Sequence, residues 1–260
     1  MTGALIESGN AGWGSPIILG ALTVAVLGAI AFVLTERRAS SPMLPLSLFS
    51  SRAFTGGTAI GLCINLGLYG ELFVLTLYLQ QLRGYSPLLA GVALLPQMGM
   101  LTIGSTLSGR IAARNGPRLP MLVGLGTGAV GLFLLAAAGP HTAYRLLVVP
   151  LMLAGFGMSM TMPAATTAVV EAAPEERAGL AGGTINAARQ TGGLLGIALM
   201  GTLVSSHGRF NGDSHMALAV GGAAFLLGWL IALCTAPAHE PAGLRMAPTT
   251  SSTRSKPSPS

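Results

Sequence analysis

Long runs of uncharged, mostly apolar residues alternate along the chain with short polar segments. Seven runs of 18 to 28 residues contain no Asp, Glu, Lys or Arg. A helix that crosses a bilayer needs about 20 predominantly apolar residues. The pattern therefore predicts an all-α polytopic membrane protein with seven transmembrane helices. We place them at residues 15–34, 56–79, 88–109, 119–138, 147–170, 180–204 and 216–235.

The overall composition supports a membrane protein. Apolar residues make up 51% of the chain and charged residues only 8%, with a mean hydropathy of +0.67. Soluble domains carry about 25% charged residues. A water-facing surface cannot be built from so few charges, so we expect the lipid bilayer to be the solvent for most of the chain.

The basic residues predict the orientation of the helices. Ten of the 14 Lys and Arg residues lie on one side of the predicted spans, three lie on the other, and Arg189 lies within a span. Cytoplasmic loops are enriched in Lys and Arg. We therefore expect a multi-pass membrane protein with its N terminus outside and its C terminus in the cytoplasm. Thirteen arginines against one lysine, with abundant Ala and Gly, indicate a bacterial genome rich in G and C, so the membrane we expect is a bacterial inner membrane. The formal charge of +6 is then a sign of topology, and we expect no nucleic-acid partner.

The segments outside the spans follow from this topology. Residues 1–14 form an outer N-terminal segment, residues 35–55 a cytoplasmic linker and residues 236–260 a cytoplasmic tail. The tail is rich in Pro, Ser and Thr, a composition typical of disorder. The outer segment lacks basic residues and shows no cleavable signal peptide. Two explanations stay open: helices that normally precede it are missing, or the chain is a genuine seven-helix protein with its N terminus outside.

The second span carries the first candidate functional residues. At 100° per residue, Thr58, Asn65, Tyr69 and Thr76 fall within about 40° of one another. Such a polar stripe either faces a water-filled cavity or forms hydrogen bonds between packed helices. Glu71 lies in the same span on a nearly opposite face.

A carboxyl group inside a membrane is costly and is a functional candidate by default. Apolar surroundings favour the neutral form of a carboxyl, so Glu71 is a candidate proton carrier. The alternative for Glu71 is a structural carboxyl near the outer end of the span, paired with a neighbouring helix.

The fifth and sixth spans supply further candidates. Met152, Ser159 and Met162 align on one face of the fifth span, together with Gly155 and Thr166. Flexible methionines suit surfaces that bind varied apolar ligands, although ordinary helix packing explains the same pattern. Arg189, in the sixth span, must find a carbonyl, a carboxylate or water, in a structural role or in contact with substrate. GxxxG spacings in several spans predict close helix packing.

Catalytic and metal-binding patterns are not evident in the sequence. There is no HExxH, Walker A or CxxC motif, and the four histidines fall in predicted loops or the tail. We therefore expect no enzymatic activity, no metal site and no cofactor.

Several segments carry a family resemblance. LYLQQLRGYSPLLAGVALLP (77–96) resembles the hallmark of the fourteen-helix drug:proton antiporters of the major facilitator superfamily (EmrB/QacA type). GWGSP, ERRASSPMLPLSLF and INAARQTGGLLGIAL also fit that family, in its order. The resemblance implies that residues 15–34 are one inserted central helix and that residues 56–235 are a six-helix C-terminal transporter half. The spans at 56–79 and 147–170 would then border the central cavity.

The loop GRIAARNGPR (109–118) resembles the superfamily's inner-loop motif, G-x-L-a-D-R-x-G-R-[KR]. Gly109, Arg114, Gly116 and Arg118 fall on motif positions, while Ala113 replaces the aspartate. The cluster also contains Arg110. The resemblance implies a degenerate second copy of the motif that positions the loop more than it gates the inner face.

The resemblance implies proton-coupled export of drugs or of small apolar or cationic metabolites by alternating access. The expected partners are the bilayer, a small-molecule substrate, protons and an N-terminal transporter half. The alternative is a non-transporting seven-helix membrane protein that acts as a scaffold or binds a partner.

Overall fold

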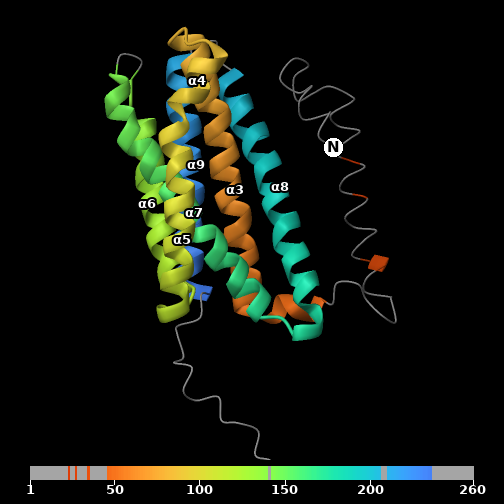
Figure 1. Cartoon of the computed structure of the whole chain (residues 1–260). Helices are drawn as coiled ribbons and strands as arrows, with labels where there is room; N and C mark the ends of the chain where they lie inside the picture. The colour runs from red at the N-terminus through yellow and green to blue at the C-terminus, as the bar shows by residue number, and fades with distance from the viewer. Residues whose placement is uncertain are drawn as a thin grey trace, which may run out of the picture.

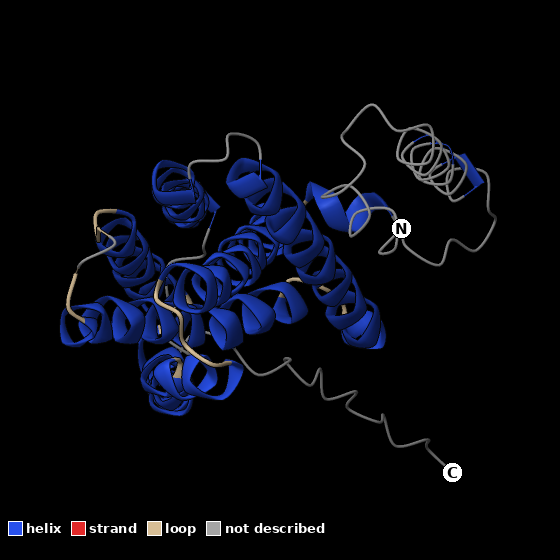
Figure 2. Ribbon diagram, turned by 90° about the horizontal axis from the view of Figure 1, so that it is seen from above, coloured by secondary structure: helices blue, strands red, loops and turns tan. Residues whose placement is uncertain are grey.

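The computed structural model describes residues 46–139, 142–205 and 210–235, together with Thr23, Leu27, Leu34 and Thr35. Throughout these residues the regular secondary structure is helical, without a strand (Figures 1 and 2), which confirms the predicted all-α class. The predicted span at 15–34 lies outside the described residues apart from three isolated positions. The segment 1–14 and the tail 236–260 also lie outside them.

The described helices follow the predicted spans closely. In chain order they are η1 (Leu46–Ser50), α3 (Arg52–Leu77), η2 (Tyr78–Leu82), α4 (Pro87–Ala93), α5 (Leu95–Asn115), α6 (Arg118–Ala136), α7 (Tyr144–Glu171), η3 (Glu175–Arg177), α8 (Ala178–Ser205) and α9 (Phe210–Thr235).

Five helical segments of the described chain are long and apolar enough to cross a bilayer: Arg52–Leu82, Pro87–Asn115, Arg118–Ala136, Tyr144–Glu171 and Ser214–Thr235. The predicted span at 180–204 corresponds to α8, which has 28 residues and so the necessary length. It falls short of the other five in apolar character, because Asn186, Arg189 and Gln190 lie near its middle.

Two of the predicted spans have irregularities that the apolar pattern did not show. The first is η2, one turn of π-helix that extends the C-terminal end of α3. The second is a break between α4 and α5 at Leu94. The break has a local cause, because Pro96 has no N–H to donate and its ring clashes with the carbonyl of the residue four positions earlier. By contrast, α7 continues through both Pro150 and Pro163.

Helix α3 is the centre of the bundle. It packs against α7, α8 and α9, while α6 packs against α7 and α9 and α5 packs mainly against α7 (Figure 1). Phe54, Ile60 and Ile64 of α3 are buried in one apolar cluster with α6, α7, α8 and α9. Large apolar side chains on the outside of the bundle remain exposed, such as Leu88 (80%) and Leu146 (62%). Lipid covers such surfaces in a membrane protein.

Glycines set the closest helix contacts, as the GxxxG spacings predicted. A Cβ atom added to Gly157 of α7 would lie 2.3 Å from the backbone N of Gly128 in α6. A Cβ on Gly192 or Gly196 of α8 would lie 2.2 Å from a backbone carbonyl oxygen of α3. The helix backbones therefore touch directly, as small residues allow in membrane bundles.

Candidate functional site

Arg189 lies between α3, α7 and α8 and is partly buried. Its Nη2 donates to the Sδ atom of Met162 in α7 at 2.9 Å. Its Cγ packs against Gly61 of α3, 3.1 Å from the position that a Cβ would take there. Its Nε is buried and has no hydrogen-bond partner among the described residues. The guanidinium is thus placed by contacts with two other helices, but its donors are largely unused.

Asn65 lies on the same side of α3 as Arg189. Its side chain is only 2% exposed, and its Oδ1 has no partner in the described part of the chain. One turn below it, Gly61 contacts Arg189, and one turn above it, Tyr69 packs on Gly193 of α8. Tyr69 itself is 40% exposed.

The structure therefore brings four of the predicted residues to one face of the bundle. We call it the α3–α7–α8 face, defined by Asn65, Tyr69, Met162 and Arg189.

Thr76 shares the predicted stripe on α3, but its hydroxyl is occupied within the helix. Thr76 Oγ1 donates to the carbonyl oxygen of Leu72 at 2.6 Å, and Thr58 bonds to Phe54 in the same way at 2.8 Å. Both hydroxyls are thus satisfied by their own helix. Substrate contact at Thr76 stays a prediction.

The predicted stripe on α7 divides between two neighbours. Ser159 is 5% exposed, and its Oγ donates to the carbonyl oxygens of Met100 in α5, at 3.1 Å, and of Phe156, at 3.0 Å. Gly155 packs on the backbone oxygen of Gln97, also in α5. Met162 instead contacts α8. The upper part of the stripe thus has the helix-packing arrangement, and a substrate role for Ser159 or the partly buried Met152 stays a prediction.

Glu71 is buried on the other side of α3, against α5. It is 2% exposed, and its Oε1 accepts a hydrogen bond from Nε2 of Gln97 at 3.1 Å. Within the described ranges, no basic side chain pairs with it. The partner is a neutral amide from the neighbouring helix.

Gln97 was missed by the sequence reasoning, which looked for charges within the spans. It is fully buried, and its Oε1 has no hydrogen-bond partner among the residues described. The signal that could have found it is that Gln97 is the one amide side chain in the predicted span at 88–109. The pair leaves one unused acceptor directly beside a carboxyl, and a proton on Glu71 would provide the missing donor.

The inner-loop residues lie where α5 ends and α6 begins. Gly116 ends α5 with φ of 76°, a left-handed conformation that favours glycine, and its N–H donates to Ala112 at 2.9 Å. Arg118 Nη2 donates to the carbonyl oxygen of Leu233 at 3.2 Å, near the C-terminal end of α9. These contacts fix the loop to the bundle, and the positioning role of the motif stays a prediction. Gly109, Arg110 and Arg114 are exposed on α5.

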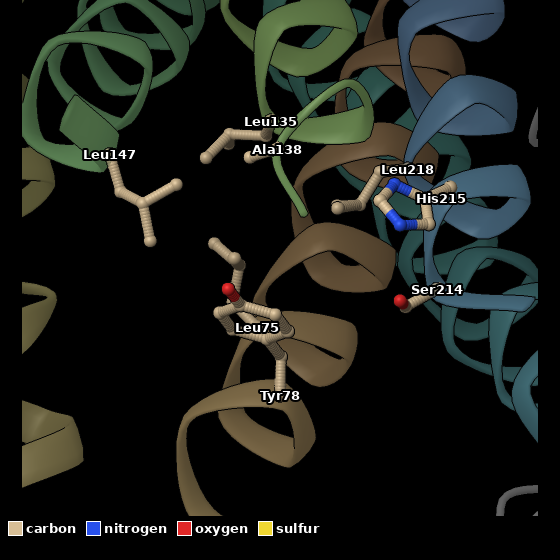
Figure 3. Close-up of a pocket in the computed structure, with 8 residues that line it drawn as sticks. All are labelled: Leu75, Tyr78, Leu135, Ala138, Leu147, Ser214, His215 and Leu218. Atoms are coloured by element: carbon tan, nitrogen blue, oxygen red, sulfur yellow. The ribbon is translucent and has the colours of Figure 1, made fainter. Parts of the chain in front are cut away.

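The opposite end of the bundle holds a small pocket between α3, η2, α6, α7 and α9 (Figure 3). Its volume of about 10 Å³ leaves room for roughly one water molecule, too little for a drug-sized substrate. Tyr78, which lines it, donates from its hydroxyl to the carbonyl oxygen of Gly139 at 3.1 Å. Arg83 holds Tyr78 in place through Nε at 3.1 Å and also donates to the carbonyl oxygen of Thr142. This end is a clamp between helices rather than a binding cavity.

Comparison with known families agrees with this architecture. The family model for the Major Facilitator Superfamily matches residues 1–197 and, again, residues 97–257. The chain belongs to the major facilitator superfamily. Membership in this superfamily, together with the apolar helices of the described chain, indicates a multi-pass membrane protein.

Individual relatives of this superfamily chain are resistance proteins. It is 35% identical to the methylenomycin A resistance protein of Bacillus subtilis (strain 168) over 91% of this chain and 51% of the relative. It is 37% identical to the tetracenomycin C resistance and export protein of Streptomyces glaucescens over 78% and 38% of the two chains. It is 34% identical to the multidrug resistance protein Stp of Mycobacterium tuberculosis (strain ATCC 25618 / H37Rv) over 84% and 40%. The chain spans about half, or less, of the length of these relatives.

Proposed function

We propose that this chain is the C-terminal half of a fourteen-helix drug:proton antiporter, which exports drugs or small apolar or cationic metabolites by alternating access. The superfamily membership and the names of the relatives support the transport of drug-like molecules. In such transporters one helical half rocks against the other around a site near the middle of the membrane. We therefore propose that a second half, in the same or in another polypeptide, covers the α3–α7–α8 face.

The observation that carries proton coupling is the buried pair of Glu71 and Gln97. A neutral Glu71 donates its O–H to the unused Oε1 of Gln97 while it accepts from Nε2, so both amide groups are satisfied. When Glu71 loses its proton, Gln97 Oε1 loses that donor and a negative charge stays in apolar surroundings. Both effects penalise the arrangement in which Glu71 lies buried against Gln97. Deprotonation therefore favours an arrangement in which Glu71 reaches water.

Helix α3 provides the link between protons and substrate. Asn65 and Tyr69 lie on one side of α3 and Glu71 on the other, and the six residues from Asn65 to Glu71 rise by about 9 Å along the helix. A shift of α3 at the Glu71 contact therefore moves the α3–α7–α8 face as well. The coupling needs no further relay, because one rigid helix carries both groups of residues.

The orientation is part of the proposal. Arg52, Arg114 and Arg177 lie at one end of the bundle, and Arg83 and Arg145 lie at the other. The positive-inside rule assigns the first end to the cytoplasm of a bacterial inner membrane. The α5–α6 loop then faces the cytoplasm, and the C terminus is inside.

The test is transport by reconstituted vesicles. Proteoliposomes would contain this chain alone, or this chain with the N-terminal half of the Bacillus subtilis methylenomycin A resistance protein. Three fluorescent apolar probes would be used: an acid, an alcohol and a quaternary amine. When both halves are present, an imposed proton gradient should drive the accumulation of at least one of them. Glu71→Gln should abolish the response to the proton gradient and leave substrate binding intact. Glutamine keeps the hydrogen bonds of a neutral carboxyl, but its amide does not release or take up a proton.

Two controls make the result specific. Glu171→Gln removes an exposed carboxylate at the end of α7 and should leave transport unchanged. Collapse of the gradient with a protonophore should stop accumulation by the unmodified protein. Proton-driven transport that survives Glu71→Gln at equal protein levels would rule out Glu71 as the coupling group. No transport by any pairing of halves would instead favour a non-transporting membrane protein.

A further inference from the structure

We propose that the α3–α7–α8 face recognises a carboxylate or carbonyl oxygen of an apolar substrate through Arg189, and disfavours cationic compounds. This inference rests on the proposed function, because it treats that face as the substrate site. It narrows the expected substrates, which included both apolar and cationic metabolites, to a class set by the residues of this chain.

Arg189 gives the α3–α7–α8 face its positive charge. Of the four residues that define the α3–α7–α8 face, Arg189 is the one that carries a charge at neutral pH. Glu71, the buried carboxyl of α3, is directed to α5 and bound to Gln97. No carboxylate of the described residues pairs with Arg189, whose one recorded polar contact is the sulfur of Met162. The face therefore presents a positive charge that has no counter-ion in this half of the transporter.

Arg189 also has hydrogen-bonding capacity to spare. A guanidinium has five N–H donors, and a thioether sulfur is a weak acceptor. Nε is buried without a partner, and a buried donor left unmade is costly. An oxygen of a bound ligand removes this cost. Carboxylates suit Arg best, because they accept two parallel hydrogen bonds from the planar guanidinium.

Asn65 and the neighbouring side chains restrict further the class of ligand that fits this face. Asn65 is nine-tenths buried or more and has an unused acceptor, Oδ1, on the same face as Arg189. A hydroxyl or N–H next to the acidic or carbonyl oxygen would satisfy it. Met162 and the ring of Tyr69 provide adaptable apolar surface for the rest of the molecule. The fitting class is thus an apolar molecule with an oxygen acceptor and, beside it, a hydrogen-bond donor.

A cationic ligand meets the opposite conditions. It would bring a second positive charge close to Arg189, where the low dielectric of the membrane interior strengthens repulsion. It would also leave Nε without an acceptor. Permanently charged quaternary amines should therefore bind this face at least tenfold more weakly than acids with the same apolar body.

Binding of three matched probes tests the inference. The full chain would be placed in nanodiscs of zwitterionic phosphatidylcholine and equilibrated by dialysis with 1-pyrenebutyrate, 1-pyrenebutanol or 1-pyrenebutyltrimethylammonium. Nanodiscs without protein correct for partition into lipid. We expect saturable binding in the order acid, alcohol, quaternary amine, with at least a tenfold difference in Kd between the first and the last.

Substitutions locate the preference. Arg189→Gln should weaken binding of the acid about ten- to a hundredfold, as expected when a charge-assisted hydrogen bond is lost, and should bring the three probes close together. Arg189→Lys keeps the charge and should retain part of the preference. Arg145→Gln removes an exposed arginine at the outer end and should have no effect.

The possible outcomes separate this inference from the proposed function. Equal or tighter binding of the quaternary amine would overturn the oxygen preference, while export as such could still hold. The same would follow if Arg145→Gln weakened the acid as much as Arg189→Gln, because the effect would then be general surface charge. Saturable binding of none of the probes would overturn both the inference and the assignment of this face to substrate.

Discussion

Gly192 of α8 should tolerate no side chain, because it lies against the backbone of α3. A Cβ atom placed there would be 2.2 Å from the carbonyl oxygen of Leu62, about 1.2 Å short of the 3.4 Å at which ordinary van der Waals contact begins. The obstacle is backbone, so no rotamer change relieves it. Gly196, one turn later, faces Leu66 O at the same 2.2 Å. A single methyl group therefore has to push α3 and α8 apart over at least one turn.

The cost follows from this geometry. Overpacking by one or two methyl groups in a rigid contact costs about 1–3 kcal/mol, a large share of a typical folding free energy. Gly192→Ala is expected to lower the free energy of unfolding by that amount. Gly183→Ala is the matched control on the same helix, because a Cβ there has nothing within 4 Å. The control should be neutral, or stabilising by up to about 1 kcal/mol through its higher helix propensity.

The measurement is a titration of the purified chain with sodium dodecyl sulfate from mild micelles, followed by circular dichroism. The midpoint of Gly192→Ala should fall below that of the unmodified protein, and the midpoint of Gly183→Ala should not. Equal midpoints for the two variants would refute the direct backbone contact between α3 and α8.

Two further predictions concern polar contacts between helices. Gln97→Leu should destabilise the bundle by about 1–3 kcal/mol, because it leaves Glu71 buried without a partner. Adding Glu71→Leu in the same chain should recover most of that loss. A double-mutant cycle measured by unfolding would contradict the pairing if the two effects were additive. Arg118→Ala should cost about 0.3–1 kcal/mol, because it loses the exposed hydrogen bond to the Leu233 carbonyl near the end of α9. Arg114→Ala, at an exposed site in the last turn of α5, should cost less. Equal thermal midpoints for the two alanine variants would count against this contact.

The sequence predicted the helices well because the bilayer dictates their length. The span expected at 119–138 is α6, Arg118–Ala136, and the span expected at 147–170 is α7, Tyr144–Glu171. Apolar runs of about 20 residues leave little freedom for their boundaries. The break at Leu94 also had a signal in Pro96, but the one turn of π-helix at the end of α3 leaves no such mark in the apolar pattern.

The candidate site was predicted only in part. The helical repeat predicts which residues share one face of a helix, but it does not predict which other helix packs against that face. The helical repeat placed Asn65 and Tyr69 together, and the structure adds Arg189 and Met162 to that face. The same repeat placed Ser159 with Met162, yet α5 covers Ser159 and not Met162. Which helix lies against each part of a face depends on contacts between distant segments, and a single helical repeat does not contain that information.

The hydrogen bonds that Tyr78 and Arg83 make to the connection between α6 and α7 bear on which substitutions this connection tolerates. Arg83 and Tyr78 hold the connection between α6 and α7 through the carbonyl oxygens of Gly139 and Thr142, which are main-chain atoms. Any residue at these two positions offers the same oxygen, and a methyl group at Gly139 would meet only the Thr142 hydroxyl, at 3.9 Å. Substitutions at Gly139 and Thr142 should therefore leave these hydrogen bonds in place. The two positions are suitable for attaching a spectroscopic label.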